Sequence, residues 1–438
     1  MPRSINVLVV DDSALMRRII SRLLETRAGI KVIDTAAGGE EAIKKVRALR
    51  PDVVTMDVEM PGLNGVQTVS RLMKECPVPV VMLSGLTTKG ARVTMEALAA
   101  GAVDFVPKPQ KAGGTEQMVA ELARKIRVAS RVSPKKCPAV PAGPRPAAPA
   151  PLPITPGAPG KPAATPAAGA AEPAVKPGAA PSTGTAGPAA GTVAVSPAGK
   201  PVATRSQGAP GRAGAAASTL PVKSPLPVPA RVPAAPVTPL SKAKLPGQTE
   251  LVVIGSSTGG PAALQTLLPA LPGDLPCGIV VVQHIPKGFS GPMAEHLDRK
   301  CKLAVKHAQQ GDRVAPGLVL VAPAGYDLTF RKIAGRLTVH LDKGDKPVPP
   351  GGFRPSVDGV MSSAAQVAGG RTLGVLLTGM GRDGARGMLA IKQQGGYTIA
   401  QDESTSVVYG MPKAAADLGA AEKILPLQNI AAEITRLV

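Results

Sequence analysis

The sequence predicts two parallel α/β domains joined by a long disordered segment, and three observations carry this prediction. Residues 5–131 alternate short runs of Val, Ile and Leu with longer amphipathic stretches, and residues 251–438 do the same. Strands that are apolar throughout are typical of parallel sheets covered by helices on both faces. Residues 132–249 lack this alternation and are rich in Pro, Ala and Gly. A chain of 438 residues also exceeds the usual size of one domain.

Residues 1–131 are predicted to form a (βα)5 domain. The expected strands are Ile5–Val10, Val32–Ile33, Val53–Met56, Val80–Leu83 and Val103–Val106. The expected helices are Ala14–Leu24, Glu40–Leu49, Val66–Met73, Thr94–Ala100 and Met118–Val128. In such a doubly wound sheet, ligands lie at the carboxyl ends of the strands.

Residues 132–249 are predicted to be a disordered, semi-stiff tether. They hold 27 of the 48 prolines and none of the seven Phe and Tyr residues, so they have little with which to build a core. They also hold 12 Lys and Arg against one acid, Glu172, and thus carry +11 of the net charge of +21. We interpret these basic residues as solvating charges in preference to a docking surface for acidic receptors or membranes.

Residues 250–438 are predicted to be a second doubly wound α/β domain. Its expected strands are Leu251–Ile254, Gly278–Val282, Gly317–Val321, Leu373–Leu377 and Tyr397–Ala400. The segment from Leu328 to Leu341 alternates in polarity around Ala334-Gly335, which predicts a β-hairpin.

The chain is expected to be cytoplasmic. No apolar run approaches the roughly 18 residues that span a bilayer. The first apolar run ends at Asp11 and Asp12, which excludes a signal peptide. The four cysteines (Cys76, Cys137, Cys277, Cys301) lie far apart and match no zinc pattern, which favours a reducing compartment.

Polar residues at the strand ends of the first domain predict a phosphorylation site. Asp11-Asp12, Asp57, Ser84 and Lys108 lie at or just beyond the ends of the first, third, fourth and fifth strands. Carboxylates gathered at one sheet edge repel one another, and Mg²⁺ is the usual hard cation that relieves this repulsion. Asp57 can then act as a nucleophile toward a phosphoryl group, with Lys108 and Ser84 binding its oxygens. Solvated loop acids are the alternative for any one position, but the four matches together favour the site.

The segments VLVVDDS, VTMDVEMPGLNG, VVMLSGLT and DFVPKP resemble the response-regulator receiver domain, over roughly residues 4–127. The resemblance implies that Asp57 accepts the phosphoryl group and that Asp11 and Asp12 form the metal site, Asp12 as a direct ligand. It further implies a metal contact from the Glu59 backbone carbonyl, a switch hydroxyl on Ser84, a phosphate contact from Lys108 and an aromatic switch at Phe105.

Three strand ends of the second domain hold a serine, a histidine and an aspartate. Ser257 lies in the glycine-rich turn after the first strand, His284 follows the second, and Asp383 lies in the turn Gly379–Gly384. The glycine-rich turn that carries Ser257 could instead bind a phosphate, but it has no P-loop Lys and no GxGxxG pattern. His296, His307 and His340 are interpreted as structural, and Asp383 has a helix N-cap as its structural alternative.

These three residue types supply the parts of a nucleophilic relay. A serine needs a histidine to take its proton, and the imidazole needs a carboxylate to fix its tautomer. The chain order Ser257, His284, Asp383 differs from the Ser, Asp, His order of α/β-hydrolases and argues against that fold.

The segments IGSSTGGP, VVQHIPKGF, FRPSVD, LLTGMGRDGARGM and VVYGMP closely resemble the catalytic domain of the CheB protein-glutamate methylesterases, over about residues 250–437. The resemblance implies Ser257 as nucleophile, His284 as general base and Asp383 as its orienting carboxylate. It implies an oxyanion-hole N–H from Met380 and a cleft lined by Thr258 and Arg354. It also implies that the substrates are glutamyl methyl esters on chemoreceptor helices, that many members deamidate glutamine, and that the esterase reaction needs no cofactor.

In that family, a chemotaxis histidine kinase phosphorylates the receiver and relieves a block of the catalytic cleft. The linker is usually short, and here it has 118 residues. Because a long tether lowers the effective concentration of one domain at the other, we expect weaker inhibition than usual. A DNA-binding response regulator and a nucleotide-binding module are the alternative functions. The first lacks a helix-turn-helix pattern, and the second leaves His284 and the Gly379–Gly384 turn unexplained.

Overall fold

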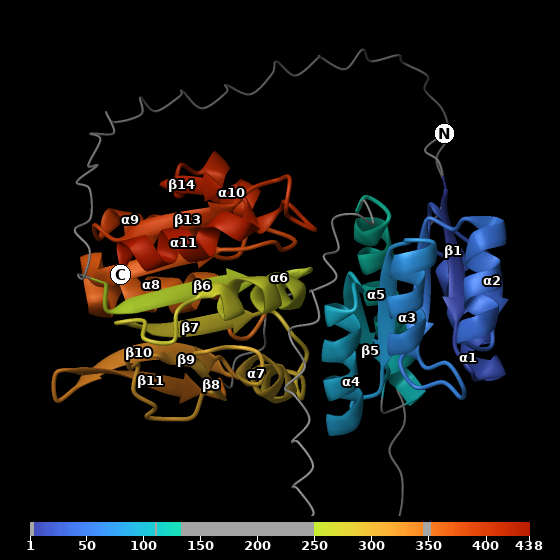
Figure 1. The fold of residues 1–438 in the computed structure, drawn as a ribbon, viewed down its shortest axis with the longest axis horizontal. Coiled ribbons are helices and arrows are strands. Elements are labelled where there is room, and N and C mark those ends of the chain that lie inside the picture. The colour runs from blue at the N-terminus through green and yellow to red at the C-terminus, as the bar shows by residue number, and fades with distance from the viewer. Residues whose placement is uncertain (1–3, 110–111, 133–248, 345–351) are drawn as a thin grey trace, which may run out of the picture. The chain divides into compact units, whose positions relative to one another are not determined.

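The computed structural model describes residues 4–109, 112–132, 249–344 and 352–438 (Figure 1). The predicted tether, residues 132–249, lies outside the described residues except at its two ends. Two parallel α/β sheets are present, one in residues 4–132 and one in residues 249–438, as the sequence predicts. None of the helices within the described ranges is long and apolar enough to cross a membrane.

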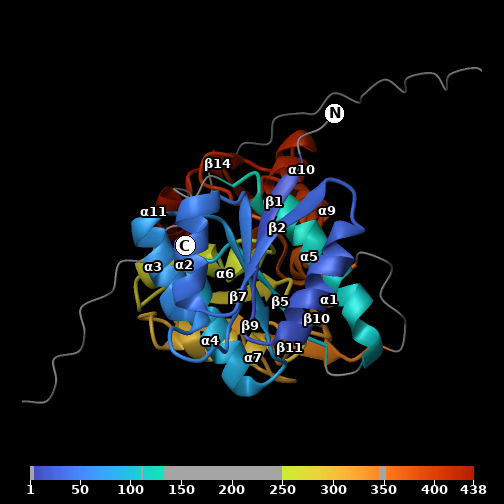
Figure 2. The ribbon, with the colours of Figure 1, turned by 90° about the vertical axis from the view of Figure 1, so that its right-hand side faces the viewer.

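The N-terminal domain is a five-stranded parallel sheet in the order β2-β1-β3-β4-β5. Its strands are β1 (Ile5–Val10), β2 (Ile30–Ala36), β3 (Val53–Asp57), β4 (Val80–Ser84) and β5 (Asp104–Pro107). Its helices are α1 (Ala14–Glu25), α2 (Gly39–Leu49), α3 (Gly65–Glu75), α4 (Thr88–Ala99) and α5 (Thr115–Ala129). Figure 2 shows this sheet between its helices.

Both faces of this sheet are buried, as the continuous apolar strands predict. Val7 and Val9 pack with helices α1 and α5 on one face, whereas Leu8 and Val10 pack with α2, α3 and α4 on the other. Helix α4 begins six residues before the expected Thr94, because the Thr87 side chain accepts a hydrogen bond from the Gly90 N–H and caps the helix.

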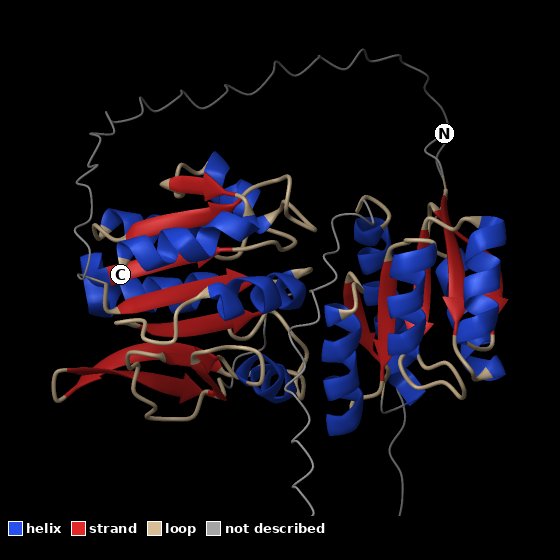
Figure 3. Ribbon diagram, in the orientation of Figure 1, coloured by secondary structure: helices blue, strands red, loops and turns tan. Residues whose placement is uncertain are grey.

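The C-terminal domain is a seven-stranded parallel sheet in the order β14-β13-β12-β6-β7-β9-β8, together with a separate hairpin (Figure 3). The sheet strands are β6 (Leu251–Ser256), β7 (Gly278–Gln283), β8 (Ala304–His307), β9 (Leu318–Val321), β12 (Thr372–Leu376), β13 (Tyr397–Gln401) and β14 (Lys423–Leu425). The helices are α6 (Gly260–Leu267), α7 (Ser290–Asp298), α8 (Val357–Ala368), α9 (Ala385–Gln393), α10 (Met411–Asp417) and α11 (Leu427–Leu437).

The predicted hairpin is confirmed. Strands β10 (Asp327–Ile333) and β11 (Arg336–Asp342) pair antiparallel, and Ala334 and Gly335 at the turn both have positive φ. The two edge strands β8 and β14 were not predicted. They are short and carry polar or exposed side chains, so they lack the apolar run that marks an inner strand.

The core of this domain also covers both faces of the sheet. Val253 and Val280 pack with helices α8, α9 and α10, whereas Ile254 and Val281 pack with α6, α7 and α11. Strand β6 lies at the centre of the sheet, between β7 and β12. The carboxyl ends of these three strands therefore meet at one edge, which is where the second candidate site lies.

Candidate functional site

The acidic cluster of the N-terminal domain is assembled as predicted. One carboxylate oxygen from each of Asp11, Asp12 and Asp57 can lie within 4.8 Å of the others. Asp11 and Asp57 are buried, and Asp12 is exposed. The Lys108 Nζ donates to Asp11 Oδ2 at 2.8 Å and to Asp57 Oδ2 at 2.7 Å, so the lysine bridges the two buried carboxylates.

Burial and charge act on this cluster in opposite directions. Burial raises the pKa of Asp57 above its ordinary value, against the opposing effect of Lys108. Burial lowers the pKa of Lys108, but its two carboxylate partners outweigh that effect and raise it. Beside the cluster, Asp12, Glu59, Asn64 and Lys89 help to line a depression of about 410 Å³. Within the cluster, Asp12 is therefore the carboxylate that faces this depression.

The two predicted switch residues are buried. Ser84 Oγ accepts a hydrogen bond from Thr94 Oγ1 at 2.6 Å and lies 3.2 Å from the Gly90 carbonyl, so it is tied to helix α4. The Lys125 Nζ lies 5.3 Å from the centre of the Phe105 ring, in cation–π contact. Both residues lie close to the cluster in the fold, at the end of β4 and within β5.

Pairing between β6 and β7 brings Ser257 and His284 to the same sheet edge. Ser256 pairs with Gln283, and the next residue of each strand is Ser257 and His284. The side-chain amide of Gln283 donates to the Ser257 carbonyl at 2.8 Å and to the His284 carbonyl at 3.0 Å. Ser256 is fully buried, and its hydroxyl donates to Gln283 Oε1 at 2.6 Å. The Ser257 hydroxyl, in contrast, forms no hydrogen bond with any residue that the structure describes.

The glycines of this region permit a close approach. Gly259 has a φ of +78°, a conformation that other residues adopt with strain. A Cβ on Gly379 would lie 2.9 Å from the Ser257 Cβ, so only glycine lets the Gly379–Gly384 turn approach the serine this closely.

His284 is held by a carboxylate and an aromatic ring. Its Nε2 lies 2.8 Å from Asp383 Oδ2, and its ring stacks on Phe353 with centroids 3.9 Å apart and planes at 8°. A ring nitrogen paired with an ionised carboxylate carries the proton, so the neutral imidazole has its lone pair on Nδ1. Nδ1 is buried and has no hydrogen-bond partner within the described ranges, and no hydrogen bond joins it to the Ser257 hydroxyl in this structure.

Asp383 is anchored by the start of helix α8. Its carboxylate accepts hydrogen bonds from the Ser356 hydroxyl at 2.8 Å, from the backbone N–H of Val357 at 2.8 Å and from that of Asp358 at 2.9 Å. Burial raises the pKa of Asp383, but the hydrogen bonds from His284, Asp358 and Ser356 outweigh it and bring the pKa down to about 2. Asp383 is therefore ionised at neutral pH and faces His284 with a full negative charge.

The remaining predicted site residues lie nearby. Thr258 is buried and directly follows Ser257 at the same sheet edge. Within the described part of the chain, no hydrogen bond occupies the backbone N–H of Met380 or of Thr258. The Arg354 guanidinium pairs with Asp327 at 3.0 Å and donates to the carbonyls of Lys343 and Gly344, which ties it to the hairpin region. Its predicted place in the cleft stays a prediction.

The other three histidines have structural partners, in line with their interpretation. His296 pairs with Gln265, and burial together with the charges of Lys300 and Arg299 lowers its pKa to about 4. His340 accepts from Gln310. His307 lies 3.0 Å from the Ser290 hydroxyl, but that hydroxyl also accepts from the Ala324 N–H, and within the described residues no carboxylate contacts the imidazole. This second serine and histidine pair therefore lacks the parts of a relay.

Sequence reasoning missed three residues that build the site: Gln283, Phe353 and Ser356. Phe353 and Ser356 both lie in the FRPSVD segment, from which only Arg354 was selected. Two features of the sequence could have pointed to them. Both residues lie in the same segment as Arg354, and Phe353 is one of only four Phe residues in the chain. Cys76 and Cys301 are free thiols, and burial raises the pKa of Cys301 to about 12.

Comparisons with known proteins agree with this architecture. The family model for the CheB methylesterase matches residues 252–434, and that for the response regulator receiver domain matches residues 7–120. The chain is 42% identical to a protein-glutamate methylesterase/protein-glutamine glutaminase of Moorella thermoacetica, over 99% of this chain and 98% of that protein. It is also 42% identical to such a protein of Carboxydothermus hydrogenoformans, over 97% of each.

Among solved structures, the chain is similar to the crystal structure of the Thermotoga maritima CheB methylesterase catalytic domain. The two are 43% identical, the match covers 43% of this chain and 99% of that one, and the TM-score is 0.42. The two family models match successive parts of this chain, and the two relatives align with it over 97% or more of both chains. The chain therefore belongs to the CheB methylesterase family, in the form that carries an N-terminal response regulator receiver domain.

Proposed function

We propose that this protein hydrolyses glutamyl methyl esters on chemoreceptors through Ser257, His284 and Asp383, and that phosphorylation of its receiver regulates this activity. The observation that carries the proposal is the His284–Asp383 pair at 2.8 Å, with the free Nδ1 of His284 at the same sheet edge as Ser257. A fixed, ionised carboxylate on one ring nitrogen leaves the other available as a base.

The reaction has two halves. The Ser257 Oγ attacks the side-chain carbonyl carbon of the ester while His284 Nδ1 takes the hydroxyl proton. His284 returns this proton to the leaving methoxide, methanol departs, and a glutamyl ester on Ser257 remains. Water then attacks this ester with His284 again as base, which releases glutamate and restores the serine. With a glutamine substrate the same steps release ammonia in place of methanol.

Electrostatic support for the tetrahedral intermediates comes from the backbone. The N–H groups of Met380 and Thr258 have no internal hydrogen bond within the described ranges, and both residues lie beside Ser257. Backbone donors that are fixed before the reaction stabilise a developing oxyanion with little reorganisation. The esterase reaction needs no metal in this scheme.

The receiver supplies the regulatory input. Asp11, Asp12 and Asp57 present three carboxylates within 4.8 Å, a donor set that suits a hard divalent cation such as Mg²⁺, with the Glu59 carbonyl as a further ligand. When bound, the cation neutralises charge on the phosphoryl group and on its acceptor. Asp57 accepts the phosphoryl group from the chemotaxis histidine kinase. Lys108 contacts that group, and Ser84 and Phe105 transmit the change.

The proposed setting is chemotaxis adaptation in the cytoplasm, with recruitment to receptor clusters. The DNA-binding alternative finds no support in the described residues, because the C-terminal domain is a seven-stranded parallel sheet with its glycine-rich turns at one edge.

Methanol release from a purified methylated receptor tests the proposal. The wild-type chain is expected to release methanol, faster with Mg²⁺ and acetyl phosphate, and Ser257→Ala is expected to abolish release. Ser256→Ala is the matched control, because it removes the adjacent buried hydroxyl and is expected to stay within about tenfold of wild type. A Ser257→Ala protein with undiminished kcat would refute the assignment.

A further inference from the structure

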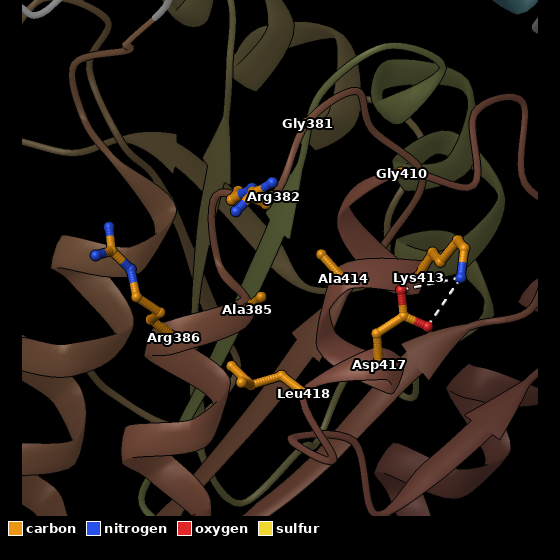
Figure 4. Close-up of a pocket in the computed structure, with 9 residues that line it drawn as sticks. All are labelled: Gly381, Arg382, Ala385, Arg386, Gly410, Lys413, Ala414, Asp417 and Leu418. Atoms are coloured by element: carbon orange, nitrogen blue, oxygen red, sulfur yellow. Dashed lines mark hydrogen bonds and ion pairs between the residues drawn. The ribbon is translucent and has the colours of Figure 1, made fainter. Parts of the chain in front are cut away.

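Beside the active site, helices α9 and α10 enclose a groove that the reaction does not use. It has a volume of about 700 Å³, and its walls include Arg382, Arg386, Lys413 and Leu418 (Figure 4). We refer to it as the α9–α10 groove. Leu418 is 45% exposed and gives the groove an apolar patch, whereas the three basic side chains make its rim cationic.

The positive charge of this groove is only partly balanced. Lys413 pairs with Asp417 at 2.8 Å, and Arg386 pairs with Asp358 at 3.1 Å while its side chain stays 84% exposed. Arg382 is exposed and forms no ion pair with any residue that the structure describes. Exposed pairs of this kind are weak, so an incoming carboxylate can replace or join them. Arginine also binds a carboxylate through two parallel hydrogen bonds.

The groove is continuous with the catalytic turn. Gly381 and Arg382 line it and directly precede Asp383, whose carboxylate holds His284. Gly410, on the opposite wall, packs so closely that a Cβ there would lie 2.6 Å from the Gly379 carbonyl. A polypeptide that presents a side chain to Ser257 therefore has neighbouring residues within reach of this groove.

We propose that the α9–α10 groove binds a carboxylate-bearing stretch of the substrate protein, next to the glutamyl ester that Ser257 attacks. This inference rests on the proposed function, because that reaction leaves a carboxylate at each hydrolysed position and so makes the substrate segment more acidic as it proceeds. The chain's own segment 132–249 does not suit the groove, because it holds 12 Lys and Arg against one acid. A cationic rim around an apolar patch fits an acidic amphipathic helix.

Binding of a methylated, soluble receptor fragment to the full chain tests the proposal. Ser257→Ala is used as background to prevent turnover, with acetyl phosphate and Mg²⁺ present. Arg382→Glu is expected to raise the Kd about tenfold and to weaken its salt dependence, with a smaller effect for Lys413→Gln. Arg382→Lys is expected to restore most of the affinity. Lys332→Glu, an exposed position on β10, makes the same charge change as Arg382→Glu and is expected to stay within about twofold of the background.

Several outcomes overturn the proposal. If the groove variants bind the receptor fragment as tightly as Lys332→Glu does, the groove is not the binding site. If Lys332→Glu loses as much affinity as Arg382→Glu, the net charge of the protein explains the binding, and the groove does not. If duplex DNA displaces the receptor and only DNA binding depends on Arg382, the groove is a nucleic-acid site. If the variants alter only self-association, it is an interface between copies. Methanol release by the wild-type chain is measured separately: its absence refutes the proposed function, whereas its presence with unchanged Kd values refutes the groove alone.

Discussion

The hydrogen bonds around Asp383 predict a pH-dependent contribution to the stability of the C-terminal domain. The carboxyl has a pKa of about 2 in the folded protein against an ordinary 3.8. At roughly 1.4 kcal/mol for each pKa unit, this difference is worth about 2 kcal/mol. Because the folded-state pKa is depressed, the contribution is complete above about pH 4 and is lost as the pH falls through 2.

Asp383→Asn removes this contribution at every pH. We therefore expect the free energy of unfolding of the variant to be about 2 kcal/mol lower than that of wild type at pH 7, and the difference to shrink toward zero near pH 2. We also expect kcat to fall by roughly a thousandfold or more at pH 7, because His284 loses its orienting charge.

Urea denaturation followed by tyrosine fluorescence measures the stability term in the intact chain. The chain has no Trp, and its three tyrosines (Tyr326, Tyr397, Tyr409) all lie in the C-terminal domain, so the signal reports that domain alone. Asp274→Asn is the control, because Asp274 is exposed and makes no hydrogen bond or ion pair with the residues that the structure describes. A loss for Asp383→Asn that is the same at pH 7 and pH 3, or below about 0.5 kcal/mol at pH 7, would refute the reasoning.

The other predictions concern the support of the relay, the receiver and the tether. Ser356→Ala deletes one hydrogen bond to Asp383, so kcat on methylated receptor should fall about tenfold with little change in KM. Ser356→Thr, which keeps the hydroxyl, should recover kcat. A change in KM alone would contradict a role of Ser356 in positioning Asp383. Phe353→Ala removes the ring stacked on His284 and should lower kcat several-fold. The control Phe330→Leu changes a buried core residue and should affect mainly stability. Equal effects of the two variants on kcat would exclude a role of Phe353 in positioning His284. Asp57→Asn should abolish the stimulation by acetyl phosphate and Mg²⁺, and stimulation that persists would exclude Asp57 as the acceptor. Shortening the 118-residue tether to about 20 residues should raise the effective concentration of the receiver about tenfold and lower the unphosphorylated methylesterase rate; an unchanged rate would show that the tether does not limit inhibition.

The sequence was sufficient to predict the two sheets and to place the chemistry at their edges. The apolar strand Val53–Asp57 ends in Asp57, the strand Leu251–Ser256 is followed directly by Ser257, and this pattern is visible without coordinates. In a parallel sheet, residues that follow neighbouring strands must lie side by side, which is why Ser257 and His284 could be paired in advance.

The sequence could not predict how each functional group is held. Asp383 is anchored by backbone N–H groups at the start of α8, and backbone donors leave no residue signature. The choice of Nε2 as the partner of Asp383 depends on ring rotation, and the stacking of Phe353 depends on the path of a loop. The edge strands β8 and β14 were missed because partial exposure removes the apolar signal.

The central claim, that Ser257 and His284 act as one catalytic unit, is tested most directly by a double-mutant comparison of kcat for methanol release. We expect Ser257→Ala and His284→Ala each to lower kcat by roughly four orders of magnitude or more, and the double variant to be no slower than either one. Losses that multiply in the double variant, or a single variant that keeps its wild-type kcat, would contradict the account.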